Sequence, residues 1–115
     1  MLGLACTPET PSLTINEKQF GKKWGRHAQD YGLDPSDASA RTWFRTHLAN
    51  VRNEPDEIRR GPYNPQGGGG EDYFFYRQGK DLVITKPTGE FVTMFPQDRP
   101  NQWLTGATTL YEKEE

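Results

Sequence analysis

The chain has 115 residues, a length that fits one small domain and is too short for two separate hydrophobic cores. Only 32% of the residues are hydrophobic but 12% are aromatic, which predicts a core built largely from aromatic side chains and argues against intrinsic disorder. The 12 Gly and 9 Pro predict extensive loops and argue against a helical bundle. Because the net charge is −2, any nucleic-acid contact has to come from a local basic patch.

The cysteine and histidine content limits the possible metal chemistry. Cys6 is the only cysteine, so the chain forms no intramolecular disulfide and no thiolate zinc site. The two histidines, His27 and His47, do not by themselves make a case for a metal site, and we expect no cofactor. No apolar run approaches the roughly 20 residues that a membrane span needs. The basic and apolar regions that a signal peptide would place before Cys6 are also missing. We therefore expect no export signal in the chain itself.

The first predicted element is a helix. Residues 1–13 show no periodicity and are predicted to be a flexible leader. The capping-box spacing of Thr14 and Glu17 predicts a helix start, and Gly32 predicts its end after Tyr31. One stripe of this helix is predicted to face the rest of the protein: Phe20, Trp24, His27, Ala28 and Tyr31.

A second helix and a long loop are predicted next. Asp34 followed by Pro35 is typical of a helix start, and Pro55 predicts the end of this helix. Its residues at helical spacing are Ala40, Trp43, Phe44, His47, Leu48 and Val51. Residues 53–72, which include four consecutive glycines, predict a long loop.

After this loop the spacing of the hydrophobic residues changes from a helical period to a period of two, which predicts strands in an antiparallel meander. Its three strands are residues 73–76, 82–85 and 91–95. Residues 103–105 and 108–111 predict one further strand, before an acidic tail at 112–115. The sequence therefore predicts an α+β fold, with two N-terminal helices packed on a small antiparallel sheet of three to four strands, as a single domain over residues 14–111.

The densest chemical cluster surrounds His27. Lys23 lies one helical turn before it and Arg26 is adjacent. RNA cleavage through the 2′-hydroxyl needs an acid or base near neutral pH, as an imidazole supplies, and cations that stabilise the phosphorane. Lys23 would supply such a charge, and the Thr93 hydroxyl would bond a nonbridging oxygen. The further predicted RNA-binding residues are Lys22, Arg26, Arg60 and Lys86.

The residue types alone are equally compatible with purely structural roles for this cluster. A histidine on an apolar stripe is more often a satisfied core residue, and Lys22, Lys23 and Arg26 are equally consistent with a solvated helix face. The apolar neighbours of His47 in the sequence favour a packing role for this side chain. An alternative function is a noncatalytic module whose aromatic strand, residues 73–76, pairs with a protein partner or stacks nucleotides.

A resemblance to a known family favours catalysis. Residues 22–32, Lys-Lys-Trp-Gly-Arg-His-Ala-Gln-Asp-Tyr-Gly, resemble the Lys/Arg-His-Ala-x-Asp-Phe-Gly signature of colicin D-like nuclease domains and related contact-dependent growth inhibition toxins. Residues 72–77, 81–85 and 88–95 are similar to the paired strands of those domains. The resemblance covers residues 14–95 and implies the barnase/EndoU/colicin/RelE-type fold and metal-independent tRNA endonuclease activity.

The resemblance also implies roles for individual residues. His27 matches the signature histidine that acts as catalytic acid or base, and Thr93 matches the strand hydroxyl that contacts phosphate. Phe95 stands where the family often has an aromatic. The family's basic residue three positions before the histidine is here Trp24, so the cation role passes to Lys23 or Arg26.

The expected location rests on the export signal and the leader, and the expected partner on the resemblance. Because we expect no export signal and an unstructured leader at residues 1–13, we expect a C-terminal toxin domain of a larger secreted protein, delivered from the producing bacterium into the target-cell cytoplasm, with a stand-alone protein as the alternative. The resemblance implies neutralisation by a cognate immunity protein. The acidic pI of about 5.7 departs from the usual basic colicin nucleases and implies a narrow substrate contact, or a helper such as an elongation factor that presents the tRNA. An acidic immunity protein would be attracted to Lys22, Lys23, Arg26 and Arg59-Arg60, and salt would slow that association.

Overall fold

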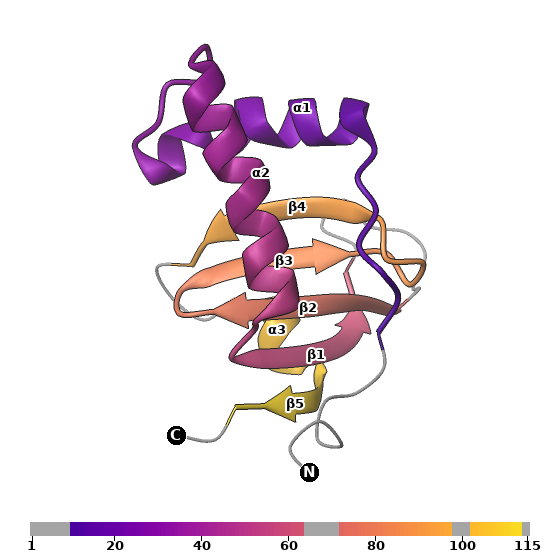
Figure 1. The fold of residues 1–115 in the computed structure, drawn as a ribbon. Coiled ribbons are helices and arrows are strands. Elements are labelled where there is room, and N and C mark those ends of the chain that lie inside the picture. The colour runs from indigo at the N-terminus through magenta and orange to yellow at the C-terminus, as the bar shows by residue number, and fades with distance from the viewer. Residues whose placement is uncertain (1–9, 64–71, 98–101, 114–115) are drawn as a thin grey trace, which may run out of the picture.

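The computed structural model describes residues 10–63, 72–97 and 102–113, which form an α+β fold (Figure 1). The helical elements are α1 (Glu17–His27), the 3₁₀ helix η2 (Ala28–Tyr31), α2 (Ala38–Asn53) and the short α3 (Gln102–Gly106). The strands are β1 (Glu57–Pro62), β2 (Asp72–Gln78), β3 (Asp81–Thr85), β4 (Phe91–Pro96) and β5 (Thr108–Glu112). None of the helices in this described part combines the length and apolar character that crossing a bilayer requires.

All five strands belong to one antiparallel sheet with the order β4-β3-β2-β1-β5. β2 is the central strand, and β4 and β5 are the edges. The register places Ile84 of β3 opposite Phe75 on one side and Thr93 on the other. Because side chains opposite one another share a face of the sheet, these three residues lie on the same face.

The two faces of the sheet are covered by different helices. α2 crosses one face, where it packs with Phe74 and Tyr76 of β2 (Figure 1). Leu104 of α3 and Ala107 pack on the opposite face against Phe75. The consecutive aromatics of β2 therefore serve both faces, as expected for a sheet covered on both sides.

Helix α1 runs along the edge strand β4. Its apolar residues Phe20 and Trp24 are buried in the core on the α2 side. Near its start, Gln19 Nε2 donates to the Val92 carbonyl oxygen at 2.8 Å. At its end, the His27 and Phe95 ring centroids are 5.5 Å apart. The helix and the strand therefore advance in the same direction, and the C-terminal end of α1 lies beside the end of β4.

The start of α1 differs from the prediction, and its end does not. Asn16 caps the helix, because its side chain accepts a bond from the Gln19 amide at 3.1 Å. The predicted Thr14 cap is wrong, since Thr14 forms a parallel bridge with Glu90 in the structure. The predicted stop at Gly32 is confirmed: this glycine caps η2 with a φ of 70°, a left-handed conformation that glycine adopts without strain.

Helix α2 begins later than predicted. Asp37 caps it by accepting bonds from the amides of Ser39 and Ala40. Asp34, the predicted cap, instead accepts the backbone N–H and the hydroxyl of Ser36 and closes a local turn. Asp34 and Asp37 are both suitable capping residues, and Asp37, which follows the turn, is the one that starts the helix.

The predicted long loop is wrong over residues 57–62, which form β1, while residues 64–71 lie outside the described residues. Ile58 is the only aliphatic residue of this strand, so the hydrophobic pattern did not reveal it. Glu57 is nevertheless 4% exposed, because Arg59 and Arg77 bond its carboxylate. A Cβ at Gly61 would lie 2.9 Å from the Ala107 Cβ, so glycine permits the close contact there.

The C-terminal part also differs from the prediction. Residues 103–105 are in helix α3 rather than in a strand, and only 108–112 join the sheet. Together with β1, this gives five strands where three to four were expected. Most of the predicted leader, residues 1–9, lies outside the described residues, but Thr10 and Pro11 accept hydrogen bonds from Arg52 of α2.

Candidate active site

His27 is held by a carboxylate one turn further along the chain. Its Nδ1 lies 2.7 Å from Oδ2 of Asp30, which the tighter η2 helix brings onto the same side. The His27 side chain is only 16% exposed, which limits its freedom to rotate. Because Asp30 engages Nδ1, Nε2 is the ring nitrogen left for proton transfer to a bound molecule.

The imidazole lines a pocket at the end of strand β4. The pocket measures about 460 Å³ and is lined by His27, Asp30, Phe95 and Pro96. The Phe95 ring is tilted by 36° to the imidazole. One wall is therefore apolar and flat, and the other carries a proton-transfer group with its orienting carboxylate.

Lys23 belongs to the same stripe of α1. It lies one turn after Gln19, which bonds Val92, and one turn before His27, which contacts Phe95. Lys23 is therefore beside the middle of β4, where Thr93 is located. Its side chain is half-buried, and burial together with the neighbouring charges of Arg26 and Lys22 lowers its pKa.

Arg26 adds positive potential toward the α3 side of the sheet. Tyr63 packs on that face against Phe75 and Trp103. Burial raises the pKa of Tyr63, and the charge of Arg26 partly opposes this effect. Arg26 itself is exposed, so its guanidinium is available to an anionic ligand.

Thr93 lies close to the pocket without lining it. It is two residues before Phe95 on the same strand face, a separation of about 7 Å. Thr93 is 1% exposed, and its buried Oγ1 has no hydrogen-bond partner within the described structure. Thr93 is thus fixed on the face of β4 that carries Phe95, but its hydroxyl is enclosed by protein in this conformation.

The other predicted RNA-binding residues are not brought to His27. Lys86 follows β3 at the far end of the sheet from Pro96, and its Nζ lies 3.3 Å from Glu90. Arg60 is also toward that end, over the Phe74 ring and 3.9 Å from Asp72. Lys22 lies on another side of α1, lining a pocket with Glu90.

The Arg59-Arg60 pair does not form a free basic surface either. Arg59 Nη1 donates to the Leu104 carbonyl oxygen at 2.9 Å, and its Nε donates to Glu57 at 2.7 Å. The bond to Leu104 attaches α3 to β1, and the bond to Glu57 lies within β1. The positive charge near His27 is therefore supplied by Lys23 and Arg26, and not by residues of β1.

Two interactions were missing from the sequence-based interpretation. Asp30 is part of the signature segment, and its spacing of three residues from His27 was the available signal. His47, expected to pack, also bonds a carboxylate: its Nε2 is 2.6 Å from Oδ2 of Asp81. That second pair spans 34 residues of sequence, so no local pattern indicates it.

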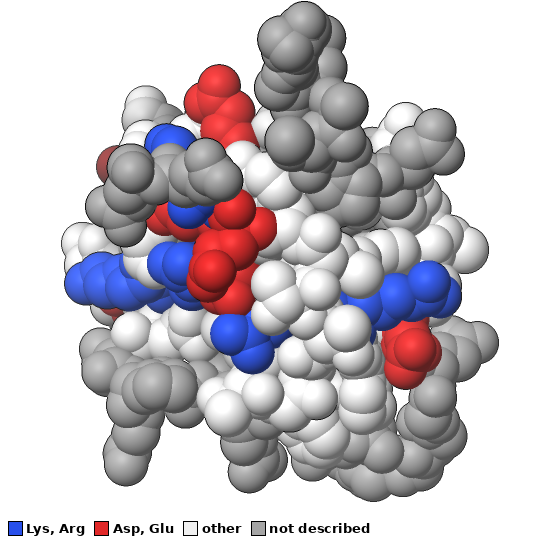
Figure 2. Space-filling model, turned by 90° about the horizontal axis from the view of Figure 1, so that it is seen from below, with Lys and Arg blue, Asp and Glu red and all other residues white. Residues whose placement is uncertain are grey.

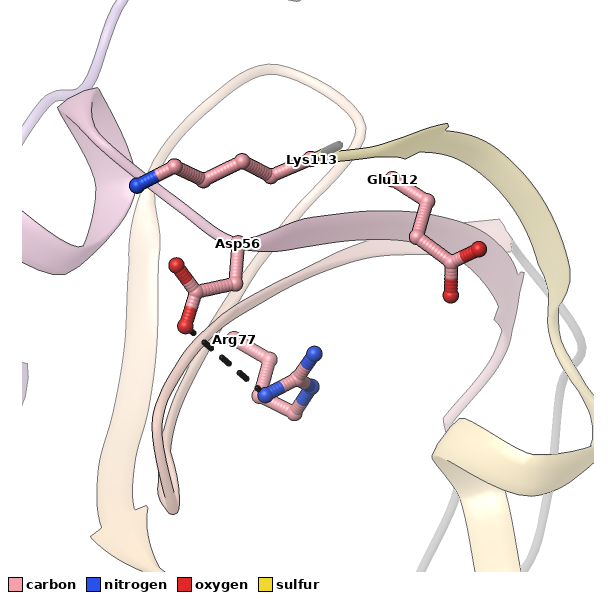
Figure 3. A pocket seen from close by; sticks show the side chains of 4 residues that line it. All are labelled: Asp56, Arg77, Glu112 and Lys113. Atoms are coloured by element: carbon pink, nitrogen blue, oxygen red, sulfur yellow. Dashed lines mark ion pairs between the residues drawn. The ribbon is translucent and has the colours of Figure 1, made fainter. Parts of the chain in front are cut away.

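A further pocket of about 510 Å³ is lined by Asp56, Arg77, Glu112 and Lys113 (Figure 3). Asp56 and Arg77 point toward one another, with Oδ2 and Nη1 3.9 Å apart, whereas Lys113 and Glu112 extend in opposite directions (Figure 3). On the side of the molecule that Figure 2 shows, acidic and basic side chains are intermixed. This pocket offers neither an imidazole nor a continuous basic surface to RNA.

Comparisons of the sequence with protein-family models and with curated proteins find no match. No group of three or more His, Cys, Asp and Glu side chains suited to a metal ion occurs in residues 10–63, 72–97 and 102–113.

Proposed function

We propose that this chain is a metal-independent endoribonuclease that cleaves tRNA, a colicin D-like toxin domain with the barnase/EndoU/colicin/RelE-type fold. The observation that carries the proposal is the His27–Asp30 pair, which lines a pocket with Phe95 and lies one helical turn from Lys23. The resemblance of residues 22–32 to the nuclease signature supports the same conclusion independently of the geometry.

In the proposed reaction, His27 Nε2 accepts the proton of the 2′-hydroxyl as the 2′ oxygen bonds to phosphorus. The bond from phosphorus to the 5′ oxygen breaks, which leaves a 2′,3′-cyclic phosphate, and the 5′ oxygen takes a proton from solvent. Asp30 stabilises the imidazolium that forms. Lys23 and Arg26 stabilise the added negative charge of the phosphorane, and Phe95 offers a ring on which a base stacks.

Thr93 takes part once substrate reaches the α3-side face of β4. Its hydroxyl has no hydrogen-bond partner in the described structure, so a phosphate oxygen would supply the missing bond. Because the hydroxyl is enclosed, this step requires the side chains that cover it to move aside. We therefore assign Thr93 a smaller contribution than His27.

The alternative of a noncatalytic module at residues 73–76 is less well supported. β2 pairs with β1 on one side and β3 on the other, so it offers no edge to a partner strand. Phe74, Phe75 and Tyr76 are buried and are not available to stack on nucleotides. The aromatic strand is accounted for by the core of the protein.

The resemblance extends the proposal to partners. We propose delivery into a target-cell cytoplasm as part of a larger secreted protein, neutralisation by a cognate immunity protein, and presentation of tRNA by an elongation factor. Since Arg59 is engaged with Glu57 and α3, an acidic immunity protein would dock at Lys23 and Arg26. Salt would slow this association if the charges steer it.

The test is incubation of the purified chain with total tRNA and a metal chelator, with and without cell extract. The proposal predicts discrete fragments that end in a 2′,3′-cyclic phosphate. Lys23→Ala should slow their formation, whereas Lys18→Ala, which removes an exposed lysine of the same helix, should not. Intact tRNA in every condition, or equal loss in both variants, would contradict the proposed site.

A further inference from the structure

Helix α2 presents an exposed aromatic ring near the candidate active site. Trp43 is 44% exposed, and together with Leu110 it is one of two exposed large hydrophobic side chains among the described residues. It lies nearly parallel to the imidazole of His47, with 4.7 Å between ring centroids and an interplanar angle of 13°. One face of the indole is therefore supported by protein.

The support beneath Trp43 is fixed by a buried contact. His47 Nε2 lies 2.6 Å from Asp81 Oδ2 at the start of β3, and both side chains are less than one-fifth exposed. Tyr31 of η2 contacts Trp43 edge to face, with 5.6 Å between centroids. The indole thus contacts Tyr31 of η2 and His47 of α2, and His47 is in turn anchored to Asp81 of β3.

Amide side chains accompany this ring. Trp43, Thr46, His47, Asn50 and Asn53 line a pocket of about 400 Å³, and their spacing places them along one face of α2. A carboxamide carries both hydrogen-bond donors and acceptors, as the edge of a nucleobase does. The lining contains no Lys or Arg, but Arg52 Nη1 donates to Asn53 Oδ1 at 3.4 Å from beside it.

This pocket is adjacent to the one that contains His27. Tyr31, which contacts Trp43, directly follows Asp30 in η2. Across the sheet, Asp81 of β3 pairs with Pro96 of β4, and Pro96 lines the His27 pocket. Trp43 and the His27 pocket therefore lie toward the same end of the sheet, and η2 contributes a residue to each.

We propose that the Trp43 pocket binds an unstacked nucleobase of the RNA that is cleaved at His27, and this rests on the function proposed above. The base stacks on the outer face of the indole, which is turned away from His47. Stacking on an aromatic ring accepts any base. Trp43 would thus hold the RNA beside the cleavage site while His27 carries out the reaction.

The direct test uses the four ribonucleosides, which lack phosphate and so do not depend on Lys23 or Arg26. Titration is followed by NMR of the Trp43 indole N–H and the Asn50 and Asn53 side-chain amides. The proposal predicts saturable shifts of the indole N–H with at least one nucleoside, and smaller shifts of the two amides, which lie beyond His47. These shifts should be lost in Trp43→Ala and retained in Leu110→Ala, the matched removal of the other exposed large apolar side chain. Absence of saturable shifts up to the solubility limit of all four would overturn the proposal.

A second measurement separates this proposal from that of the nuclease. Trp43→Ala should raise the KM for tRNA roughly 5- to 150-fold, the usual effect of removing one stacking ring, while kcat changes less. Trp43→Phe should restore most of the affinity, and Leu110→Ala should have no effect. Unchanged KM in Trp43→Ala would overturn the base pocket and leave the nuclease intact. Nucleoside binding without any cleavage would instead reject the nuclease, and binding of a protein partner in place of nucleosides would assign Trp43 to a protein interface.

Discussion

Replacing Thr93 with valine should stabilise the fold and weaken the proposed activity at the same time. The Thr93 hydroxyl is buried and lacks a partner in the described structure, so folding removes it from water without compensation. Such a group costs about 1–3 kcal/mol, and valine has nearly the same shape without it. We expect Thr93→Val to increase the free energy of unfolding by about 1 kcal/mol and to slow tRNA cleavage through loss of the phosphate contact.

Thr85 provides the matched control for this substitution. It is also fully buried in the sheet, but its Oγ1 donates to the Lys86 carbonyl oxygen at 3.2 Å. Thr85→Val should therefore lower the free energy of unfolding by about 1 kcal/mol, the net value of a typical hydrogen bond. Urea unfolding of both variants measures the two signs directly. Equal destabilisation by both substitutions would refute the assignment of an unpartnered hydroxyl at position 93.

Two further predictions concern the β1 region. Gly61→Ala should lower the free energy of unfolding by about 1–3 kcal/mol, because the new Cβ would lie 2.9 Å from the Ala107 Cβ. Gly25→Ala, whose new Cβ meets nothing within 4 Å, should raise the free energy of unfolding by about 0.5–1 kcal/mol through helix propensity. Urea unfolding that gives both variants a change of the same sign would contradict this packing. Burial alone would raise the pKa of Glu57, but hydrogen bonds from Arg77 and Arg59 outweigh it, so the pKa is lowered and Glu57 stabilises the fold above its unfolded-state pKa. That stability should be lost as the pH falls through the lowered pKa. Glu57→Gln should lower the free energy of unfolding by about 1.5–3 kcal/mol at neutral pH and make it depend less on pH in acid. An unchanged pH dependence in the variant would argue against this ion-paired carboxylate.

The sequence predicted those parts of the fold in which local pattern and tertiary packing agree. Phe20 and Trp24 are on the buried side of α1 as their spacing indicates, and Gly32 ends the helical segment. The three meander strands form where alternation and turn residues coincide. The α+β class follows from these elements together.

Other parts of the fold depend on contacts that a local pattern does not contain. β1 buries Glu57 through arginines from β1 and β2, so its strand character has no apolar alternation to reveal it. Asn16 was overlooked because the capping-box spacing of Thr14 and Glu17 was complete without it. At such positions, tertiary bonding overrides the local preference.

The candidate site shows the same division. Lys23 and His27 were found from helical spacing, and the fold places both along β4. Arg60 and Lys86 were grouped with them only by charge, and strand register separates them from His27. The Trp43 pocket was not foreseen, because its support by Asp81 requires β3 to lie under α2.

The most direct test of the central claim is the tRNA cleavage rate of His27→Ala, measured together with its free energy of unfolding. If His27 transfers a proton, the rate should fall by roughly 10²- to 10⁴-fold while the variant remains folded. If His27 is only a structural histidine paired with Asp30, cleavage should continue at the original rate while the free energy of unfolding falls by about 1–3 kcal/mol. The first result is the one that the geometry of the His27 pocket predicts, and the second would contradict it.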